Sequence, residues 1–198
     1  MNTHENSGGN NSCCSCRASS VSSQQRALVG GAFSLTNHCG DPVTPDTYLG
    51  KYVLVSFGFT NCAVVCPRAL KRTSEALRLL GSVATEKLAV LYITVDPERD
   101  TPEVLKRYLS AFDGDIIGLT GSREQLDDVM AKFRIFAKRA PDPDAPGGYV
   151  VPHTAISYLM GPDGRYVSHF FDATTAEELA VKLRVQLCSS DEPARAAG

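Results

Sequence analysis

The fold is decided by residues 52–70, which run YVLVSFGFTNCAVVCPRAL. Residues 52–57 are mostly aliphatic, β-branched or aromatic, a composition typical of a strand buried inside a sheet. Pro67 suits the first turn of a helix, and the leucines and alanines that follow it recur at helical spacing. Cys62 and Cys66 therefore lie between a buried strand and a helix, at the strand's carboxyl end, where α/β sheets place their functional sites.

The rest of the chain continues this alternation of strands and helices. Apolar runs predict strands, and amphipathic spacing behind the caps Thr101 and Ser122 predicts helices. Strands are expected at residues 32–35, 88–95, 116–120, 155–160 and 165–171, and helices at 67–80, 101–112, 123–136 and 175–187. The last two strands flank a Gly-Pro-Asp-Gly hairpin signal. The pattern predicts an α/β protein of thioredoxin type, a three-layer sandwich with a central mixed sheet flanked by helices.

A chain of 198 residues predicts one core rather than two domains. Residues 1–26 are rich in Ser, Asn and Gly and are expected to be a disordered tail. The cysteines of this tail, interpreted as reactive thiols of an unstructured segment, are Cys13, Cys14 and Cys16. A single thioredoxin-like domain is expected at 27–188, followed by a flexible tail at 189–198. Inside the domain, the Pro/Gly-rich residues 140–148 are expected to form an exposed loop.

Composition and charge narrow the range of functions. With 43% hydrophobic residues, 21% charged residues and a formal net charge of −2, the chain has no basic surplus for a nucleic-acid partner. The start of the chain lacks the charged and apolar regions of a signal peptide. The longest uncharged stretch, residues 52–67, is shorter than the roughly 20 apolar residues that a membrane-spanning helix needs, so no membrane segment is expected.

The spacing of Cys62 and Cys66 allows two kinds of chemistry. Residues four apart on a helix share one face and are separated by about 6 Å along the axis, so both sulfurs can bind one metal ion or join in a disulfide. Arg68 and the amides at the helix start favour the thiolate, which both reactions require. The simpler alternative is a pair of small buried hydrophobic residues. Residue types and spacing alone leave metal binding and disulfide exchange open.

A pair of thiolates needs a further donor to complete a site for a soft metal, and His153 is the best candidate in the chain. It stands at the entrance of the strand expected at 155–160, which should lie beside the strand at 52–57. Two thiolates and one imidazole suit copper better than magnesium or calcium. The other histidines lie in the tail, in a turn-rich segment and in a hairpin strand, namely His4, His38 and His169.

Four blocks of the chain resemble the Sco/SenC copper-chaperone family, in the family's order, and together span residues 28–187. The blocks are GGAFSLTNHCGDPVTPDTYLGKYVLVSFGFTNCAVVCP, ITVDPERDTPEVLKRYL, GLTGSREQLDDVMAKFRIF and VVPHTAISYLMGPDGRYV. The resemblance implies a thioredoxin-like fold that binds one copper ion through Cys62, Cys66 and His153. It also implies a copper-accepting partner, a subunit of cytochrome c oxidase, whose dinuclear copper centre the family helps to assemble. Asp96, in DPERDTP, is then expected to support the ligand shell.

Two departures from the family pattern keep a second function open. Ala63 and Val64 replace the family's usual Pro-Asp after the first cysteine, which removes an acidic group beside the ion. Pro152, which is expected to border the ligand shell, replaces the usual Asp, and thioredoxin-like oxidoreductases carry a cis-proline at this kind of strand entrance. The alternative is a thiol-disulfide oxidoreductase in which Cys62 attacks, Cys66 resolves the mixed disulfide, and a thiol reductant protein is a partner. Oxidation is expected to join the two cysteines in a disulfide. The match to three copper donors favours a non-enzymatic chaperone.

The cellular location is predicted from the resemblance alone. Members of the family usually carry an N-terminal membrane anchor and face an oxidising compartment, which implies a periplasmic or inner-membrane-associated protein. This sequence shows neither an anchor nor a signal peptide. A cytoplasmic homologue with reduced thiols is therefore the alternative.

Overall fold

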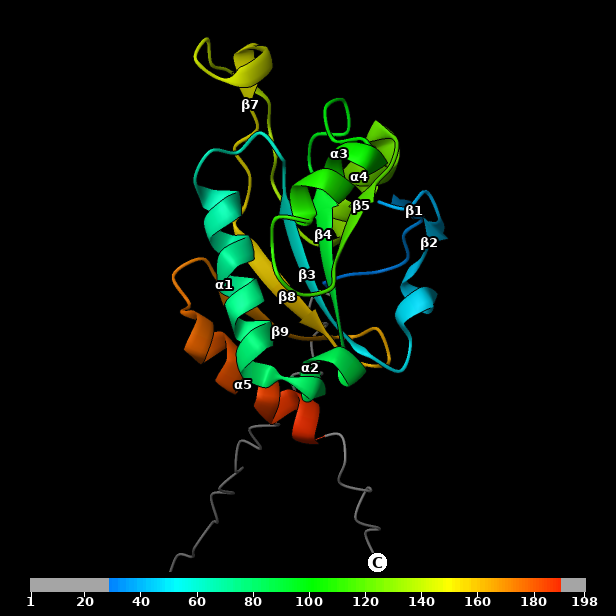
Figure 1. Ribbon diagram of the computed structural model, residues 1–198. Coiled ribbons are helices and arrows are strands. Elements are labelled where there is room, and N and C mark those ends of the chain that lie inside the picture. Colours follow the sequence, from blue (N-terminus) through cyan, green and yellow to red (C-terminus); the bar gives the residue numbers. More distant parts are fainter. Residues whose placement is uncertain (1–28, 190–198) are drawn as a thin grey trace, which may run out of the picture.

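The computed structural model describes residues 29–189, which fold around one large mixed sheet (Figure 1). Its strand order is β2-β1-β5-β4-β3-β8-β9. The strands are β1 (Leu35–Asn37), β2 (Pro42–Val43), β3 (Tyr52–Gly58), β4 (Leu88–Thr94), β5 (Ile116–Thr120), β8 (Ile156–Met160) and β9 (Tyr166–Phe171). The central strands β5, β4 and β3 are parallel, whereas the strands on either side pair antiparallel to their neighbours. β3 and β4 therefore lie in the middle of the sheet, as their apolar sequences predict.

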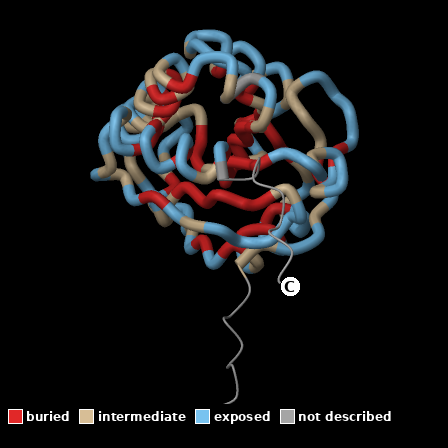
Figure 2. Tube along the Cα trace, turned by 90° about the horizontal axis from the view of Figure 1, so that it is seen from below, coloured by how far each residue is buried: buried red, intermediate tan, exposed pale blue. Residues whose placement is uncertain are grey.

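Helices cover both faces of the sheet. They are α1 (Val65–Leu80), α2 (Ser82–Lys87), α3 (Pro102–Leu109), α4 (Arg123–Lys132) and α5 (Ala176–Ser189), with a short 3-10 helix η1 (Pro45–Tyr48) before β3. Successive side chains of β3 point to opposite faces, so Leu54 packs in one core with α1, α3 and α5, whereas Val53 and Val55 pack in the other with α4. Figure 2 shows buried residues running through the middle of the molecule. The predicted three-layer sandwich is confirmed.

The predicted helices and strands are confirmed in type, with differences at their ends, and some short elements were not predicted. Thr101 and Ser122 are N-caps, because each hydroxyl oxygen accepts a hydrogen bond from the backbone N–H three residues further on. α4 was expected to continue to residue 136 but ends at Lys132, because Arg134 adopts a φ of 56° and leaves the helical conformation. β1 lies at residues 35–37 instead of 32–35, and α2 was not predicted.

The segment expected to be a loop is a two-stranded ribbon. Its strands are β6 (Ala140–Pro141) and β7 (Tyr149–Val150), with a 3-10 turn η2 (Pro146–Gly148) near the tip. Backbone hydrogen bonds extend the pairing toward the sheet, from the N–H of Lys138 to the carbonyl of Pro152 and from the N–H of Thr154 to that of Phe136. We call residues 136–154 the ribbon. It projects beyond the sheet at the top of Figure 1.

Both predicted tails lie largely outside the described residues. The whole of residues 1–26, with their cysteines, falls there, as do residues 190–198, whereas Ser189 ends α5. Within residues 29–189, every helix is too short or too polar to cross a membrane.

Candidate metal centre

The two cysteines lie where the sheet meets α1. β3 ends at Gly58 and α1 begins at Val65, so Cys62 lies in the connecting loop and Cys66 in the first turn of the helix. Gly58 is required at the end of the strand, because an added Cβ would lie 2.2 Å from the hydroxyl oxygen of Tyr92 on β4. The absence of a side chain at this point lets the tyrosine pack against the backbone from which the cysteine loop departs.

The thiols of Cys62 and Cys66 form a hydrogen-bonded pair. Cys66 is only 3% exposed, and its backbone N–H donates to Sγ of half-buried Cys62 over 3.4 Å. The hydrogen bond from Cys62 lowers the pKa of Cys66 to about 7 against the opposing effect of burial, and the same sharing of a proton raises the pKa of Cys62. Both cysteines are free thiols. The pair therefore offers one thiolate near neutral pH.

His153 reaches the same end of the sheet from the ribbon. Its Nε2 lies 3.1 Å from the carbonyl oxygen of Phe57 in β3, and its Nδ1 lies 2.9 Å from that of Val151. The imidazole also makes an edge contact with the ring of Phe59, with the centroids 5.8 Å apart. A neutral imidazole carries one N–H and donates to only one of the two carbonyls. A ring nitrogen must turn away from its carbonyl before it can bind a metal ion.

Adjoining cavities bring the three side chains to one region. A cavity of about 470 Å³ has Cys62 and His153 in its wall, and a small one of about 30 Å³ is lined by Cys66 and His153. In the part of the chain that the structure describes, no three His, Cys, Asp or Glu side chains are grouped closely enough to hold a metal ion. The fold thus gathers the predicted ligands around one region without placing them in a closed donor set.

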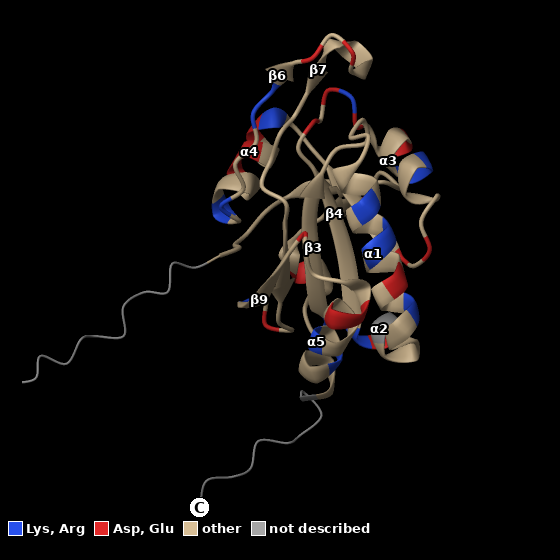
Figure 3. Cartoon of the chain, turned by 90° about the vertical axis from the view of Figure 1, so that its left-hand side faces the viewer, with Lys and Arg blue, Asp and Glu red and all other residues tan. Residues whose placement is uncertain are grey.

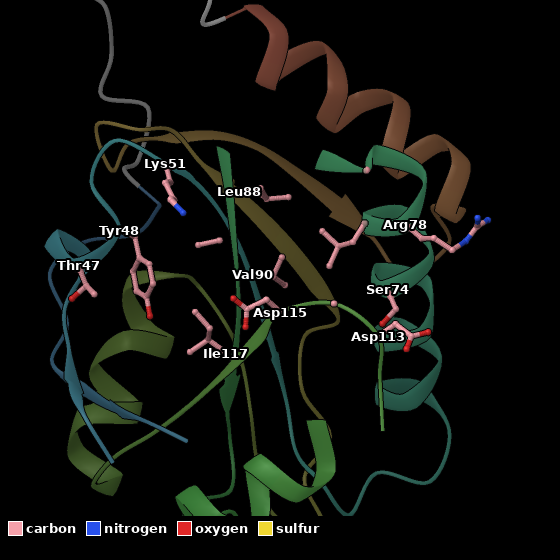
Figure 4. A pocket seen from close by; sticks show the side chains of 14 residues that line it. Thr47, Tyr48, Lys51, Ser74, Arg78, Leu88, Val90, Asp113, Asp115 and Ile117 are labelled. Carbon is pink, nitrogen blue, oxygen red and sulfur yellow. The ribbon is translucent and has the colours of Figure 1, made fainter. Parts of the chain in front are cut away.

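A larger cavity, of about 560 Å³, lies at the opposite end of the central strands (Figure 4). Its walls come from the beginning of β4, the second half of α1 and the loop before β5. Asp113 and Asp115 are part of this wall, but none of the cysteines or histidines within residues 29–189 is. The larger cavity is therefore separate from the region where the thiol pair and the imidazole lie.

Comparison with known proteins supplies the family. A family model described as SCO1/SenC matches residues 21–187, which include both cysteines and His153. The chain belongs to the SCO1/SenC family. It is 38% identical over 163 residues to the mitochondrial SCO1 homolog of Homo sapiens, and 38% identical over 156 residues to sco1 of Schizosaccharomyces pombe. These alignments cover 82% and 78% of this chain but 54% and 59% of the relatives, so the chain spans little more than half of their length.

Solved Sco structures share the fold. Bradyrhizobium japonicum ScoI with copper bound is 43% identical with a TM-score of 0.73, and the match covers 80% of this chain and 99% of that one. Yeast Sco1 with copper bound is 36% identical with a TM-score of 0.74, over 86% of this chain and 95% of that one. The thioredoxin-like fold predicted from the sequence is thereby confirmed.

Asp96, which the Sco resemblance placed near the ligands, is fully buried with 0% of its surface exposed. Its carboxylate accepts hydrogen bonds from Nε of Arg99 and from the hydroxyl of Tyr149, the latter over 3.0 Å. The bond with Tyr149 joins the loop after β4 to the ribbon. Support of the ligands by Asp96 stays a prediction, and the geometry suggests that any such effect passes through the ribbon.

Asp100 belongs to the same DPERDTP block and was missed by the sequence analysis. Its carboxylate accepts hydrogen bonds from the backbone N–H of Thr60 over 3.1 Å, from the hydroxyl of Thr60 over 2.5 Å and from the hydroxyl of Thr94 over 2.6 Å. Burial raises the pKa of Asp100, and these hydrogen bonds oppose the rise. Because Thr60 shortly precedes Cys62, Asp100 anchors the cysteine loop to β4. The sole signal in the sequence was its place within the family block.

Around the thiols, the structure answers one question that the sequence left open, the form of the bond before Pro152, and corrects one expectation, the role of Arg68. The Val151–Pro152 bond is trans, like the other peptide bonds of residues 29–189, so no cis-proline faces the cysteines. The extended pairing of the ribbon accommodates the ordinary trans form, which an X-Pro bond prefers intrinsically. Arg68, expected to stabilise a thiolate, is largely exposed and pairs with Asp172 instead. The low pKa of Cys66 thus comes first from its sulfur partner.

The remaining candidate residues lie elsewhere or alter the rim of the cavity. Val64, which stands where the family has an acidic residue, is 63% exposed and leaves an apolar surface beside Cys62. His38 accepts a hydrogen bond from the backbone N–H of Gly118 at the far side of the sheet. His169 lies outside the cavity walls, as do two exposed free cysteines, Cys39 and Cys188.

Proposed function

We propose that this chain is a copper chaperone of the Sco type, which binds one copper ion through Cys62, Cys66 and His153 and passes it to a copper-accepting protein. The observation that carries the proposal is the meeting of a hydrogen-bonded thiol pair and an imidazole at one end of the sheet. The related Bradyrhizobium japonicum ScoI and yeast Sco1 have been solved with copper bound. The acceptor we propose is a cytochrome c oxidase subunit, at its dinuclear copper centre.

The donor set suits copper as a cargo. Thiolate sulfur and imidazole nitrogen are ligands that copper prefers to the oxygen donors of magnesium or calcium sites. Cys66 supplies a thiolate near neutral pH, and binding of the ion displaces the proton that Cys62 retains. The cavity wall is largely apolar, through residues such as Phe59, Val65, Pro146 and Val151.

His153 is the donor that regulates transfer in this proposal. Its Nε2 lies beside the carbonyl of Phe57, so it binds copper by exchanging that contact for the metal. The carbonyl remains available when copper leaves, which lowers the cost of releasing the imidazole. A ligand of the acceptor protein can therefore replace His153 first, while the two sulfurs still hold the ion.

Anaerobic copper(I) titration of the reduced protein tests the assignment. We expect one copper per chain for the wild type. His153→Ala should weaken binding by more than the about 10-fold that loss of an outer partner costs at a metal site. His169→Ala is the matched control, because this exposed imidazole contacts Tyr166 on β9 and should leave the affinity unchanged. Equal copper affinity in the wild type and His153→Ala would contradict the proposal.

A thiol-disulfide oxidoreductase is the second candidate, because a thiol with a lowered pKa is what disulfide exchange requires. An attacking thiol needs a lowered pKa and access to its substrate, and no single cysteine of the pair has both. Cys66 has the lowered pKa but is buried, whereas Cys62 is accessible but has a raised pKa. This division favours the chaperone. Exchange with glutathione disulfide separates the functions, because an oxidoreductase would keep its wild-type rate in His153→Ala.

A further inference from the structure

The ribbon determines where His153 can be. His153 pairs with Ala137 across its base, and the backbone N–H of Thr154 donates to the carbonyl of Phe136 over 2.9 Å. Because such bonds connect the two sides of the ribbon, the backbone of His153 follows the ribbon as a unit. Contacts that hold the ribbon against the sheet therefore also set the position of the His153 backbone, from which the imidazole extends.

One aromatic ring of the ribbon is held between two cations. The guanidinium carbon of Arg99 lies 3.7 Å from the ring centroid of Tyr149, and that of Arg139 lies 4.0 Å from it. The hydroxyl of Tyr149 donates to the buried carboxylate of Asp96 over 3.0 Å. Figure 3 shows charged residues of both signs at this end of the molecule, around β6 and β7. The ring of Tyr149 thus contacts one cation from the loop after β4 and one from the ribbon, and its hydroxyl is bound to the loop after β4.

Arg99 connects the ribbon to the central sheet. It belongs to the loop after β4, where its Nε pairs with Asp96. Its Nη1 donates to the carbonyl oxygens of Pro146 over 2.6 Å and Tyr149 over 3.1 Å. A planar guanidinium can make these hydrogen bonds and stack on the ring at once, whereas the ammonium of a lysine cannot. Arg99 therefore ties two points of the ribbon to one buried carboxylate.

We propose that Asp96, Arg99 and Tyr149 form a latch that positions His153 beside the two thiols and thereby sets how readily it binds copper. The proposal rests on the copper function described above. These three are positioning residues, because they contact one another and the ribbon and act on copper through His153.

The physical reason is the number of positions open to the imidazole. With the latch closed, the backbone at His153 is fixed, and a side-chain rotation exchanges the carbonyl of Phe57 for copper. With the latch open, the ribbon samples several positions, and a fraction of them brings the imidazole to the metal. The apparent copper affinity falls in proportion to that fraction.

Substitutions that keep size or charge test the latch in the full-length reduced protein. The copper(I) dissociation constant, measured anaerobically against a chromophoric competitor, should rise about 10-fold in Arg99→Lys and less in Tyr149→Phe. Arg123→Lys is the matched control, since Arg123 donates to the carbonyl of Val95 and pairs with Glu98, beside the same loop but without touching Tyr149. It should bind copper as the wild type does.

A double-mutant cycle separates positioning from general loosening. In a His153→Ala background, Arg99→Lys should change the copper dissociation constant less than about 2-fold, because the latch acts through a side chain that is no longer present. Equal losses in both backgrounds would overturn the latch. Wild-type affinity in His153→Ala would contradict the copper site itself, whereas wild-type affinity in both latch variants, with His153→Ala impaired, would overturn the latch alone.

Hydrogen exchange gives a readout that needs no copper. The amides of Lys138 and Thr154 close the base of the ribbon through the carbonyls of Pro152 and Phe136. Both should exchange faster in Arg99→Lys than in the wild type or in Arg123→Lys, while amides of β3 and β4 keep their protection. Unchanged exchange at the two ribbon amides would overturn the proposal, whatever the copper affinities are.

Discussion

At the scale of single residues, the thiol pair shows how their surroundings give two identical side chains different pKa values. Cys66 is buried and Cys62 is half-buried; the hydrogen bond that the thiols share lowers the pKa of Cys66 against the opposing effect of burial, and it raises the pKa of Cys62. Residue type and spacing predicted that both sulfurs could serve one metal ion. Only the surroundings decide which sulfur is ionised first, because the difference comes from contacts that the spacing alone does not specify.

The ionisation of the pair can be followed directly. In the reduced, metal-free protein, thiolate absorbance should show a first step at a pKa of about 7, from Cys66. Cys62→Ala removes the hydrogen bond that is the largest cause of this lowered pKa, while burial still opposes the charge, so the step should move upward from about 7. Wild-type protein with a first step at or above pH 9 would contradict the described pair.

The same shift predicts how stability depends on pH. The pKa of Cys66 is lower in the folded chain than its ordinary value of 9.0, so its contribution to the free energy of unfolding is fully present above pH 9 and is lost as the pH falls through about 7. Relative to Cys66→Ala, the wild type should therefore gain stability between pH 7 and pH 9. Urea unfolding of both proteins at the two pH values measures this difference.

At the scale of elements, the cysteine loop is held by a strand that does not carry the cysteines. Asp100, after β4, binds the backbone and hydroxyl of Thr60 at the start of the loop and also binds Thr94. The loop between β3 and α1 thus depends on its neighbour in the sheet for its shape. Element types followed from local patterns, but this cross-connection between two loops is tertiary.

Removal of this anchor should destabilise the loop and the fold. Asp100→Ala leaves the buried hydroxyl of Thr94 and the partly buried donors of Thr60 without their acceptor, and a buried group left unsatisfied costs about 1–3 kcal/mol of the free energy of unfolding. Urea unfolding measures the loss, and Asp113→Ala, at an exposed position before β5, is the control. A stability of Asp100→Ala equal to that of the control would show that the network does not support the fold.

At the scale of the whole molecule, the order of strands assembles the site. β3 pairs with β8 in antiparallel fashion, from Val53 opposite Met160 to Ser56 opposite Ser157. This pairing places the entrance of β8, and with it His153, at the carboxyl end of β3, where Cys62 follows. Residues about ninety positions apart in the chain thus meet at one cavity.

The described domain contains all three proposed ligands, which leads to a prediction about the whole chain. A shortened protein that begins at residue 27 should fold and bind one copper per chain with wild-type affinity, because the ligands and their supports lie within residues 29–189. Copper stoichiometry and urea unfolding of the two proteins provide the comparison. Loss of bound copper on truncation would show that Cys13, Cys14 or Cys16 takes part.

The sequence by itself determined the class of fold, the place of the cysteines and the third candidate donor. Hydrophobic runs, helix caps and the turn before Tyr166 are local signals, and the structure has strands and helices where those signals lie. The end of α4, the ribbon and the role of Asp100 escaped prediction, because each depends on partners distant in the chain. Tertiary structure alone decided the trans bond before Pro152, the hydrogen bonds of the imidazole and the latch around Tyr149. The physical reason is that local sequence sets the preferred backbone, whereas burial and long-range contacts select which side chains meet and what protons they hold.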